Sequence, residues 1–114
     1  MVIYNDGLER LAEDIKDSLV QGQWGDGNTQ PLITDTGLES PIVSTQASTS
    51  NLRINNSIQL THEVNTVTAN GEDLTEFEIQ FVDDVGFGRT LKGPITKTED
   101  IKVTTISTYN VLRG

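Results

Sequence analysis

The sequence predicts a mainly β protein: a β-sandwich or partly closed antiparallel barrel of six to eight strands, with one N-terminal α-helix. Three observations support this fold class. Apolar residues recur at helical spacing near the N-terminus, the segments 54–68 and 74–81 alternate apolar and polar side chains, and Gly, Asn and Asp separate the segments. A chain of 114 residues predicts a single domain over 1–114, with the helix at about 6–21 and the sandwich at about 22–114.

The composition limits the classes of protein that fit. Hydrophobic residues make up 34% of the chain and aromatic residues 5%, which predicts a thin, mostly aliphatic core. With no cysteine, disulfides and thiolate metal sites are excluded. No apolar run approaches the ~20 residues of a membrane span. The net charge of −9 disfavours binding to nucleic acid or to anionic membranes, because phosphate groups would be repelled.

The N-terminal helix is predicted from one apolar stripe. Asp6 followed by Glu9 has the spacing of a capping box, and Gly22 is a candidate stop signal. The stripe predicts a helix packed on a sheet, with a partner-binding amphipathic helix as the alternative. Its members follow at i, i+3, i+4, i+7 and i+11: Leu8, Leu11, Ala12, Ile15 and Leu19.

The segment from residue 21 to residue 51 is rich in Gly, Ser, Thr and Gln, and we expect turns and loops there. Its glycines do not stand between a strand and a helix, so a phosphate-binding loop is rejected. Trp24, the only tryptophan, is interpreted either as a core or sheet-edge anchor or as a surface contact. The tract 44–51 is expected to be an exposed loop, either mobile or ordered by a neighbouring subunit.

Strands are predicted over 54–68, 74–81, 89–92 and 101–111, with residues 94–98 leading into the last of them. Asn70-Gly71 has the composition of a hairpin turn and is expected to join the first two of these strands in antiparallel order. Inward side chains are predicted for three of the strands: Ile58, Leu60, His62 and Val64 in 54–68, Thr75, Phe77, Ile79 and Phe81 in 74–81, and Ile101, Val103, Tyr109 and Val111 in 101–111. The predicted outward side chains of the second strand are Glu76, Glu78 and Gln80.

Charge placement predicts which strands are neighbours. Acidic Glu76 and Glu78 precede a C-terminal segment, 89–114, that carries five basic and two acidic residues. Opposite charges on adjacent strands contribute roughly 0.2–1 kcal/mol per pair. We therefore expect the acidic strand to share a sheet with the strands that carry Arg89, Lys92 and Lys102.

No arrangement of residues predicts catalysis, and an enzyme is not expected. His62, the only histidine, lies in an alternating strand without a nucleophile signature such as Gly-x-Ser-x-Gly. Asp83-Asp84 beside Gly86 is interpreted as a solvated turn, with calcium binding as the alternative. Phe87, in a Gly-flanked turn, is the first candidate contact residue. The full set of candidate subunit-interface residues is Trp24, Glu76, Glu78, Phe87, Arg89 and Lys92.

A succession of short motifs resembles the small structural proteins of tailed phages and archaeal tailed viruses, of tail, fibre-base or head-decoration type. The motifs are Asn5-Asp6-Gly7-Leu8 with Leu11, Gly25-Asp26-Gly27, Thr34-Asp35-Thr36-Gly37-Leu38-Glu39, Glu76-Phe77-Glu78-Ile79-Gln80-Phe81, Arg89, and Pro94-Ile95-Thr96-Lys97-Thr98.

The resemblance implies a non-enzymatic virion component without cofactors. It would be located in the virion and would bind copies of itself, as a trimer, pentamer or hexamer, together with other virion proteins. A carbohydrate- or calcium-dependent β-sandwich binding module is the alternative from a different functional class. It would require an exposed aromatic platform or a preformed carboxylate cage.

Overall fold

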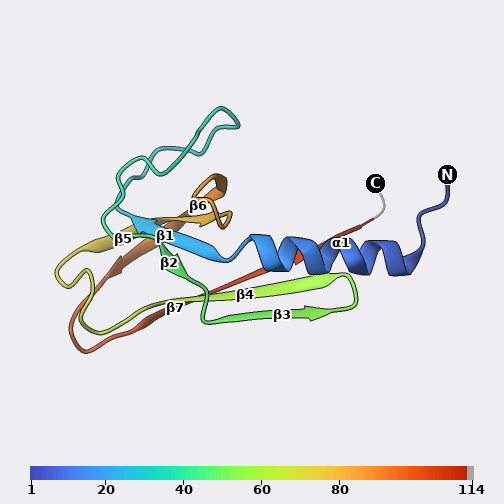
Figure 1. The fold of residues 1–114 in the computed structure, drawn as a ribbon. Helices are drawn as coiled ribbons and strands as arrows, with labels where there is room; N and C mark the ends of the chain where they lie inside the picture. The colour runs from blue at the N-terminus through green and yellow to red at the C-terminus, as the bar shows by residue number, and fades with distance from the viewer. Residues whose placement is uncertain (113–114) are drawn as a thin grey trace.

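Two antiparallel β-sheets and one α-helix make up the computed structural model, which describes residues 1–112 (Figure 1). The four-stranded sheet has the order β2-β1-β5-β6 and the three-stranded sheet the order β3-β4-β7. In chain order the elements are α1 (Asn5–Ser18), β1 (Gln21–Gly25), β2 (Gln46–Ala47), β3 (Ser50–Ile54), β4 (Ser57–Val64), β5 (Asp73–Gln80), β6 (Gly86–Thr96) and β7 (Val103–Asn110).

This architecture confirms the predicted mainly β fold with one N-terminal helix. The two sheets form an open sandwich, and no closed barrel is present in the described part of the chain. The principal dimensions are 52 × 30 × 24 Å, and the long axis follows α1 and the β3–β4 hairpin beside it (Figure 1). The last two residues of the predicted sandwich, 113 and 114, lie outside the described residues.

Helix α1 packs on β3 and β4 as the apolar stripe predicted. Leu8, Ala12 and Leu19 are buried, whereas Leu11 at the margin of the stripe is half exposed. On the polar side, Arg53 of β3 forms an ion pair with Glu13 at 2.6 Å. These contacts fix the helix against one face of the three-stranded sheet.

Both predicted end signals of the helix are wrong. Tyr4 occupies the N-cap position without a side-chain cap, so Asp6 lies inside the first turn, where its charge still favours the positive end of the helix dipole. At the other end the helix stops at Ser18, and the following residue, Leu19, is buried in the core. Gly22, the predicted stop, belongs to β1.

Strand β1 lies in the middle of the four-stranded sheet, although the glycine-rich composition predicted a loop. It pairs with β2 on one side and β5 on the other. Gly22 shows why glycine is needed here, because a Cβ atom would lie 2.7 Å from Phe77 and 2.9 Å from His62. Trp24 is buried with a 5.1 Å ring separation from Phe77, which confirms its interpretation as a core anchor.

The inward face predicted for β4 is confirmed, since Ile58, Leu60, His62 and Val64 are all buried. The hairpin predicted at Asn70-Gly71 is wrong. β4 pairs with β3 and β7, and β5 pairs with β1 and β6, so residues 65–72 cross from one sheet to the other.

Gly71 does adopt the positive φ of 85° that suggested a turn, but the turn does not join paired strands. The β3–β4 hairpin turns instead at Asn55-Asn56, where Asn55 has a φ of 54°. The tract 44–51 also differs from the predicted loop, because it contains β2 and the first residues of β3.

Strand β5 is buried on both faces. Its polar residues Glu76, Glu78 and Gln80 point away from the core between the sheets, as predicted, but they are covered rather than exposed to solvent. Phe77 and Ile79 face the core between the sheets, and Glu76, Glu78 and Gln80 are also buried. The loop of residues 26–40 covers the carboxylate of Glu76 through the backbone N–H groups of Gly27, Glu39 and Ser40. The alternating pattern therefore predicts the core face correctly at Phe77 and Ile79 but cannot predict a loop that covers the other face. At the start of β5 it is wrong, because the register shifts between Leu74 and Glu76 and Leu74, rather than Thr75, joins the core.

The charge prediction is confirmed for one pair of strands. β5 and β6 are adjacent, and Glu78 stands opposite Arg89 in their register. Lys102 precedes β7 in the other sheet and lies 3.6 Å from Glu63, so its predicted place beside the acidic strand is wrong.

The burial of the His62 ring predicts how the stability of the fold depends on pH. Its ring is buried against Phe77, and burial lowers the pKa below the ordinary value of 6.5. A weak interaction with the Val20 backbone opposes this only in part, and neither ring nitrogen has a hydrogen bond of good geometry. Between the lowered pKa and about 6.5 the unfolded chain binds more protons than the folded chain, so the free energy of unfolding falls as the pH falls.

Urea unfolding at several values from about pH 7 to about pH 5 should therefore show decreasing stability. In His62→Leu this pH dependence should be absent, whatever the absolute stability of the variant. An equal pH dependence in both proteins would contradict the assignment.

Candidate functional site

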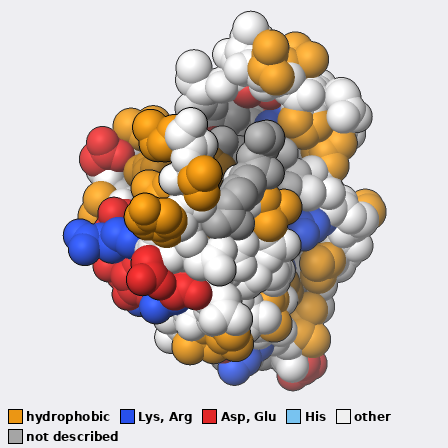
Figure 2. All heavy atoms as spheres, turned by 90° about the vertical axis from the view of Figure 1, so that its right-hand side faces the viewer, with side chains coloured by type: hydrophobic (Ala, Val, Ile, Leu, Met, Phe, Trp, Pro, Cys, Tyr) orange, Lys and Arg blue, Asp and Glu red, His pale blue; other side chains and the backbone are white. Residues whose placement is uncertain are grey.

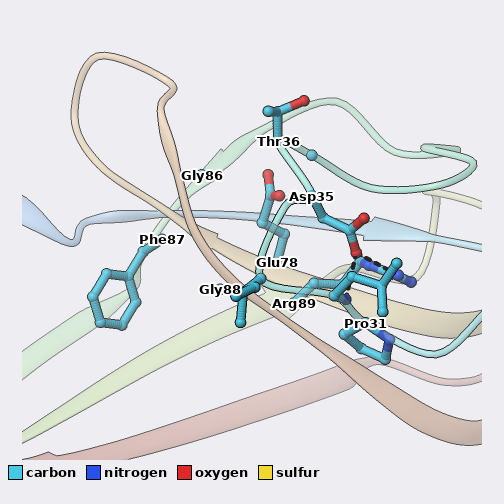
Figure 3. Close-up of a pocket in the computed structure, with 11 residues that line it drawn as sticks. Pro31, Asp35, Thr36, Glu78, Gly86, Phe87, Gly88 and Arg89 are labelled. Carbon is cyan, nitrogen blue, oxygen red and sulfur yellow. Dashed lines mark hydrogen bonds and ion pairs between the residues drawn. The ribbon is translucent and has the colours of Figure 1, made fainter.

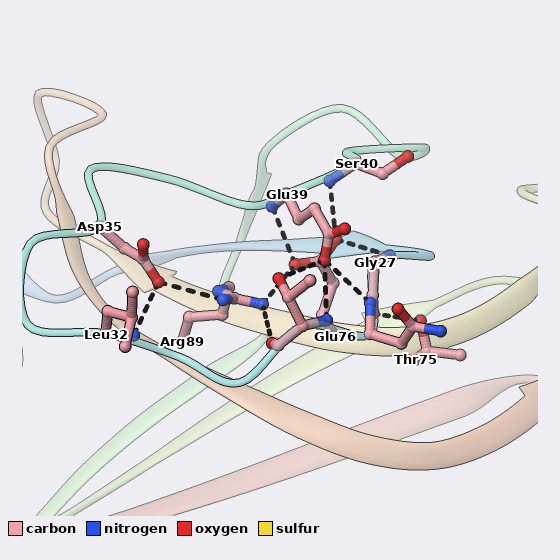
Figure 4. A network of polar contacts seen from close by, with 10 residues as sticks. Gly27, Leu32, Asp35, Glu39, Ser40, Thr75, Glu76 and Arg89 are labelled. Carbon is pink, nitrogen blue, oxygen red and sulfur yellow. Dashed lines mark hydrogen bonds and ion pairs between the residues drawn. The ribbon is translucent and has the colours of Figure 1, made fainter.

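The most elaborate polar arrangement in the molecule lies where the loop of residues 26–40 meets β5 and β6 (Figure 4). Its centre is Glu76, whose side chain is fully buried. One carboxylate oxygen accepts hydrogen bonds from the backbone N–H groups of Gly27 at 2.8 Å and Ser40 at 2.9 Å. The other accepts from the N–H of Glu39 at 3.0 Å and from Arg89 at 3.2 Å. Both oxygens of Glu76 are therefore engaged by the chain itself.

Arg89 of β6 connects Glu76 to the loop. Its guanidinium donates to the Thr29 carbonyl at 3.1 Å and forms an ion pair with Asp35 at 3.0 Å. Asp35 also accepts from the Leu32 N–H at 2.9 Å. That N–H and Arg89 lower the pKa of Asp35, and Asp35 and Glu76 raise the pKa of Arg89. Asp35 and Arg89 therefore both stay charged across the physiological range.

Glu39 closes the other end of the loop. It accepts hydrogen bonds from the hydroxyl and backbone N–H of Thr29 and from the N–H of Asn28, which together lower its pKa. Gly25 and Gly27 allow the loop to approach this closely. A Cβ at Gly25 would lie 2.5 Å from the Glu76 carboxylate, and one at Gly27 would collide with it. The network is thus a scaffold that fixes the shape of the 26–40 loop.

A cavity of about 310 Å³ lies beside this scaffold, between the loop and the start of β6 (Figure 3). Glu78 enters it from β5, and Phe87 and Gly88 contribute from β6. The loop contributes Pro31, Leu32 and Ile33, which are apolar. The cavity therefore combines the buried carboxylate of Glu78 and an apolar wall with the charged side chains of Asp35 and Arg89, which also line it.

The structure brings three of the six candidate interface residues together, namely Glu76, Glu78 and Arg89. Glu76 and Glu78 are buried within the subunit, as is Trp24, so their side chains contact the chain's own core and loop. Phe87 is 51% exposed and packs edge-on against Phe81 and Tyr109. Lys92 lies further along β6, outside the network. An interface role remains a prediction for all six residues.

Sequence reasoning gave no role to Asp35 and Glu39, the two loop carboxylates of the network. They lie in the motif Thr34–Glu39, which resembles a motif of virion structural proteins but does not by itself indicate an ion-pair network. The sequence offered one signal for this network: the motif carries two carboxylates, and Arg89, a basic residue later in the chain, could pair with them.

Other candidate chemistry is not assembled in the described residues. Asp83 and Asp84 are exposed in the turn between β5 and β6, and residues 1–112 contain no group of three or more His, Cys, Asp or Glu side chains placed to hold a metal ion. Within the same residues, α1 is too short and too polar to cross a lipid bilayer.

Comparison with known proteins does not assign a family. No protein-family model matches the chain, and no curated protein matches its sequence significantly.

Proposed function

We propose that the chain is a non-enzymatic structural protein of a tailed virus particle, in the tail, baseplate, fibre or capsid decoration, and that it assembles there as a symmetric homo-oligomer. The observation that supports this most strongly is the outer face of the three-stranded sheet, the face turned away from α1. We call it the outer face. It consists of Ser50, Leu52, Ile54, Ser57, Gln59, Thr61, Glu63, Thr104, Ile106, Thr108 and Asn110.

The outer face has the composition of a contact surface. Leu52, Ile54 and Ile106 expose 53%, 74% and 58% of their surface, and the residues between them are mainly Ser, Thr and Gln. Apolar side chains grouped on one sheet face favour a protein partner. Both outer strands, β3 and β7, pair on one side only, so this sheet also has two open edges.

Charge favours a second copy at this face. The chain carries a net charge of −9, so two copies repel each other over most of their surfaces. The outer face has one ionisable side chain, Glu63, which already lies 3.6 Å from Lys102. Copies can therefore approach through this face with little electrostatic repulsion.

Other surfaces are available to further virion proteins. Figure 2 views the end of the molecule where α1 begins and shows exposed hydrophobic side chains in separate groups with charged side chains among them. Met1, Val2 and Tyr4 near this end are strongly exposed. The scaffold of Glu76, Arg89 and Asp35 also supports a building-block role, because it fixes the 26–40 loop in one shape.

Ile106→Lys tests the assembly surface. The substitution places a charge on the β7 side of the outer face, where burial of an unpaired ammonium against a second copy is unfavourable. Sedimentation velocity is expected to show a concentration-dependent oligomer for the wild type and at least ~10-fold weaker association for the variant.

Val67→Lys is the matched control, since Val67 is 81% exposed but lies in the connection after β4, outside the outer face. It should assemble as the wild type does. A wild type that stays monomeric at high concentration, or equal effects of both lysine substitutions, would contradict the proposed contact.

Residence in a virus particle is tested separately by mass spectrometry of purified particles from the virus that encodes the chain. The proposal expects the chain at a stoichiometry similar to that of the other structural proteins. Its absence from intact particles would refute this part of the proposal.

A further inference from the structure

The cavity between the 31–37 loop and the start of β6 contains a carboxylate without a positive partner. Figure 3 shows Glu78 rising from β5 into the space between the loop residues Asp35 and Thr36 and the strand residue Gly86. Glu78 is 4% exposed. Its Oε1 accepts one hydrogen bond, from the Gln80 side-chain amide at 2.7 Å. Its Oε2 accepts none from residues 1–112.

Arg89 does not neutralise Glu78, although the two residues are opposite each other in the strand register. The guanidinium is directed to Glu76 and Asp35, and no basic side chain of the described residues lies within ion-pair distance of Glu78. A buried carboxylate with one neutral donor is unfavourable unless a cation or further donors reach it. The cavity is the route by which such a group would arrive.

The shape and the acceptors of the cavity select among cations. Gly86 has no side chain, and a Cβ there would lie 2.8 Å from Glu78 Oε2, so the strand leaves this oxygen room. Asp35 uses only Oδ2 for its ion pair and for the Leu32 N–H, which leaves Oδ1 as a second acceptor on the cavity wall. Pro31, Leu32 and Ile33 provide an apolar wall for a methylene chain.

We infer that this cavity binds a primary alkylammonium group, and that its natural occupant is a lysine side chain of a neighbouring protein chain. An ammonium is a point charge with three donors on a flexible stem, and it can bond to single oxygens of two carboxylates. A guanidinium favours two oxygens of one carboxylate, and Glu78 offers only one. The statement that the lysine belongs to a neighbouring chain rests on the proposed function. The ammonium site itself does not depend on it.

The test is a titration of the ¹⁵N-labelled protein with n-butylammonium chloride, followed by NMR at constant ionic strength. The amide signals of Gly86 and Gly88, which line the cavity, are expected to shift and to saturate. 1-Butanol has the same length without the charge and should leave these signals unchanged at equal concentration. Equal shifts with butanol, or none with butylammonium, would overturn the inference.

Two variants locate the binding group. Glu78→Gln should weaken butylammonium binding at least ~10-fold. Glu63→Gln, the same change on the outer face, should leave it unaltered. Unchanged butylammonium binding by Glu78→Gln would overturn the assignment. If that variant does not fold, the comparison of butylammonium with butanol on the wild type decides instead.

The same titration of Ile106→Lys separates this inference from the proposed function. Retained butylammonium binding in a dissociated variant supports the site independently of assembly. A loss of binding there, with the fold intact, would show that the cavity is not complete within one chain and would overturn the inference.

Discussion

Replacing Glu76 by glutamine is expected to lower the free energy of unfolding by about 3–5 kcal/mol, the range found when one partner of a buried ion pair is removed. Both Glu76 oxygens accept hydrogen bonds from N–H groups, so whichever oxygen becomes NH₂ will face a donor. Arg89 would also lose one of its two negative partners. Urea unfolding, followed by fluorescence of the buried Trp24, measures the change.

Glu63→Gln is the control for this prediction. It makes the same chemical change in a partly exposed ion pair with Lys102, and it should cost at most about 1 kcal/mol. If the two variants were equally stable, the carboxylate network would not be the element that holds the 26–40 loop in place.

Phe77→Ala is expected to lower the free energy of unfolding by about 3–5 kcal/mol as well, for a different reason. The ring lies at the centre of the sandwich, 5.1 Å from Trp24 and 5.5 Å from His62, and Gly22 packs directly on it. Removing it leaves a cavity that both sheets border. The same unfolding experiment measures the loss.

Phe87→Ala is the matched comparison, because Phe87 is 51% exposed and contacts Phe81 and Tyr109 by its edges. Its removal should cost less than about 2 kcal/mol. A larger loss for Phe87 than for Phe77 would place the core of the protein elsewhere than between the two sheets.

Patterns within single segments predicted much of the fold. The apolar stripe identified the helix, and alternation identified the buried face of β4, because both signals depend only on which side of an element is covered. Which distant segments pair as neighbouring strands was harder to predict. Asn70-Gly71 has the local chemistry of a hairpin, but the burial of β4 and β5 in different sheets overrides it.

Glycine residues caused a second error in the predicted fold. In β1, Gly22 and Gly25 allow close packing against Phe77 and Glu76 and do not form a turn. A glycine in the sequence does not by itself show which of these two roles it has. The candidate site was also only partly predictable. Glu76, Glu78 and Arg89 were selected for their charges, but their buried positions follow from a loop whose path the sequence does not reveal.

Isotope-filtered NMR on a mixture of ¹³C-labelled and unlabelled copies tests the central claim, that copies of this chain meet through the outer face. The proposal predicts intermolecular NOEs from the methyl groups of Leu52, Ile54 and Ile106 to protons of the unlabelled copy. Intermolecular NOEs confined to other surfaces, or none at concentrations where the protein is expected to associate, would contradict it.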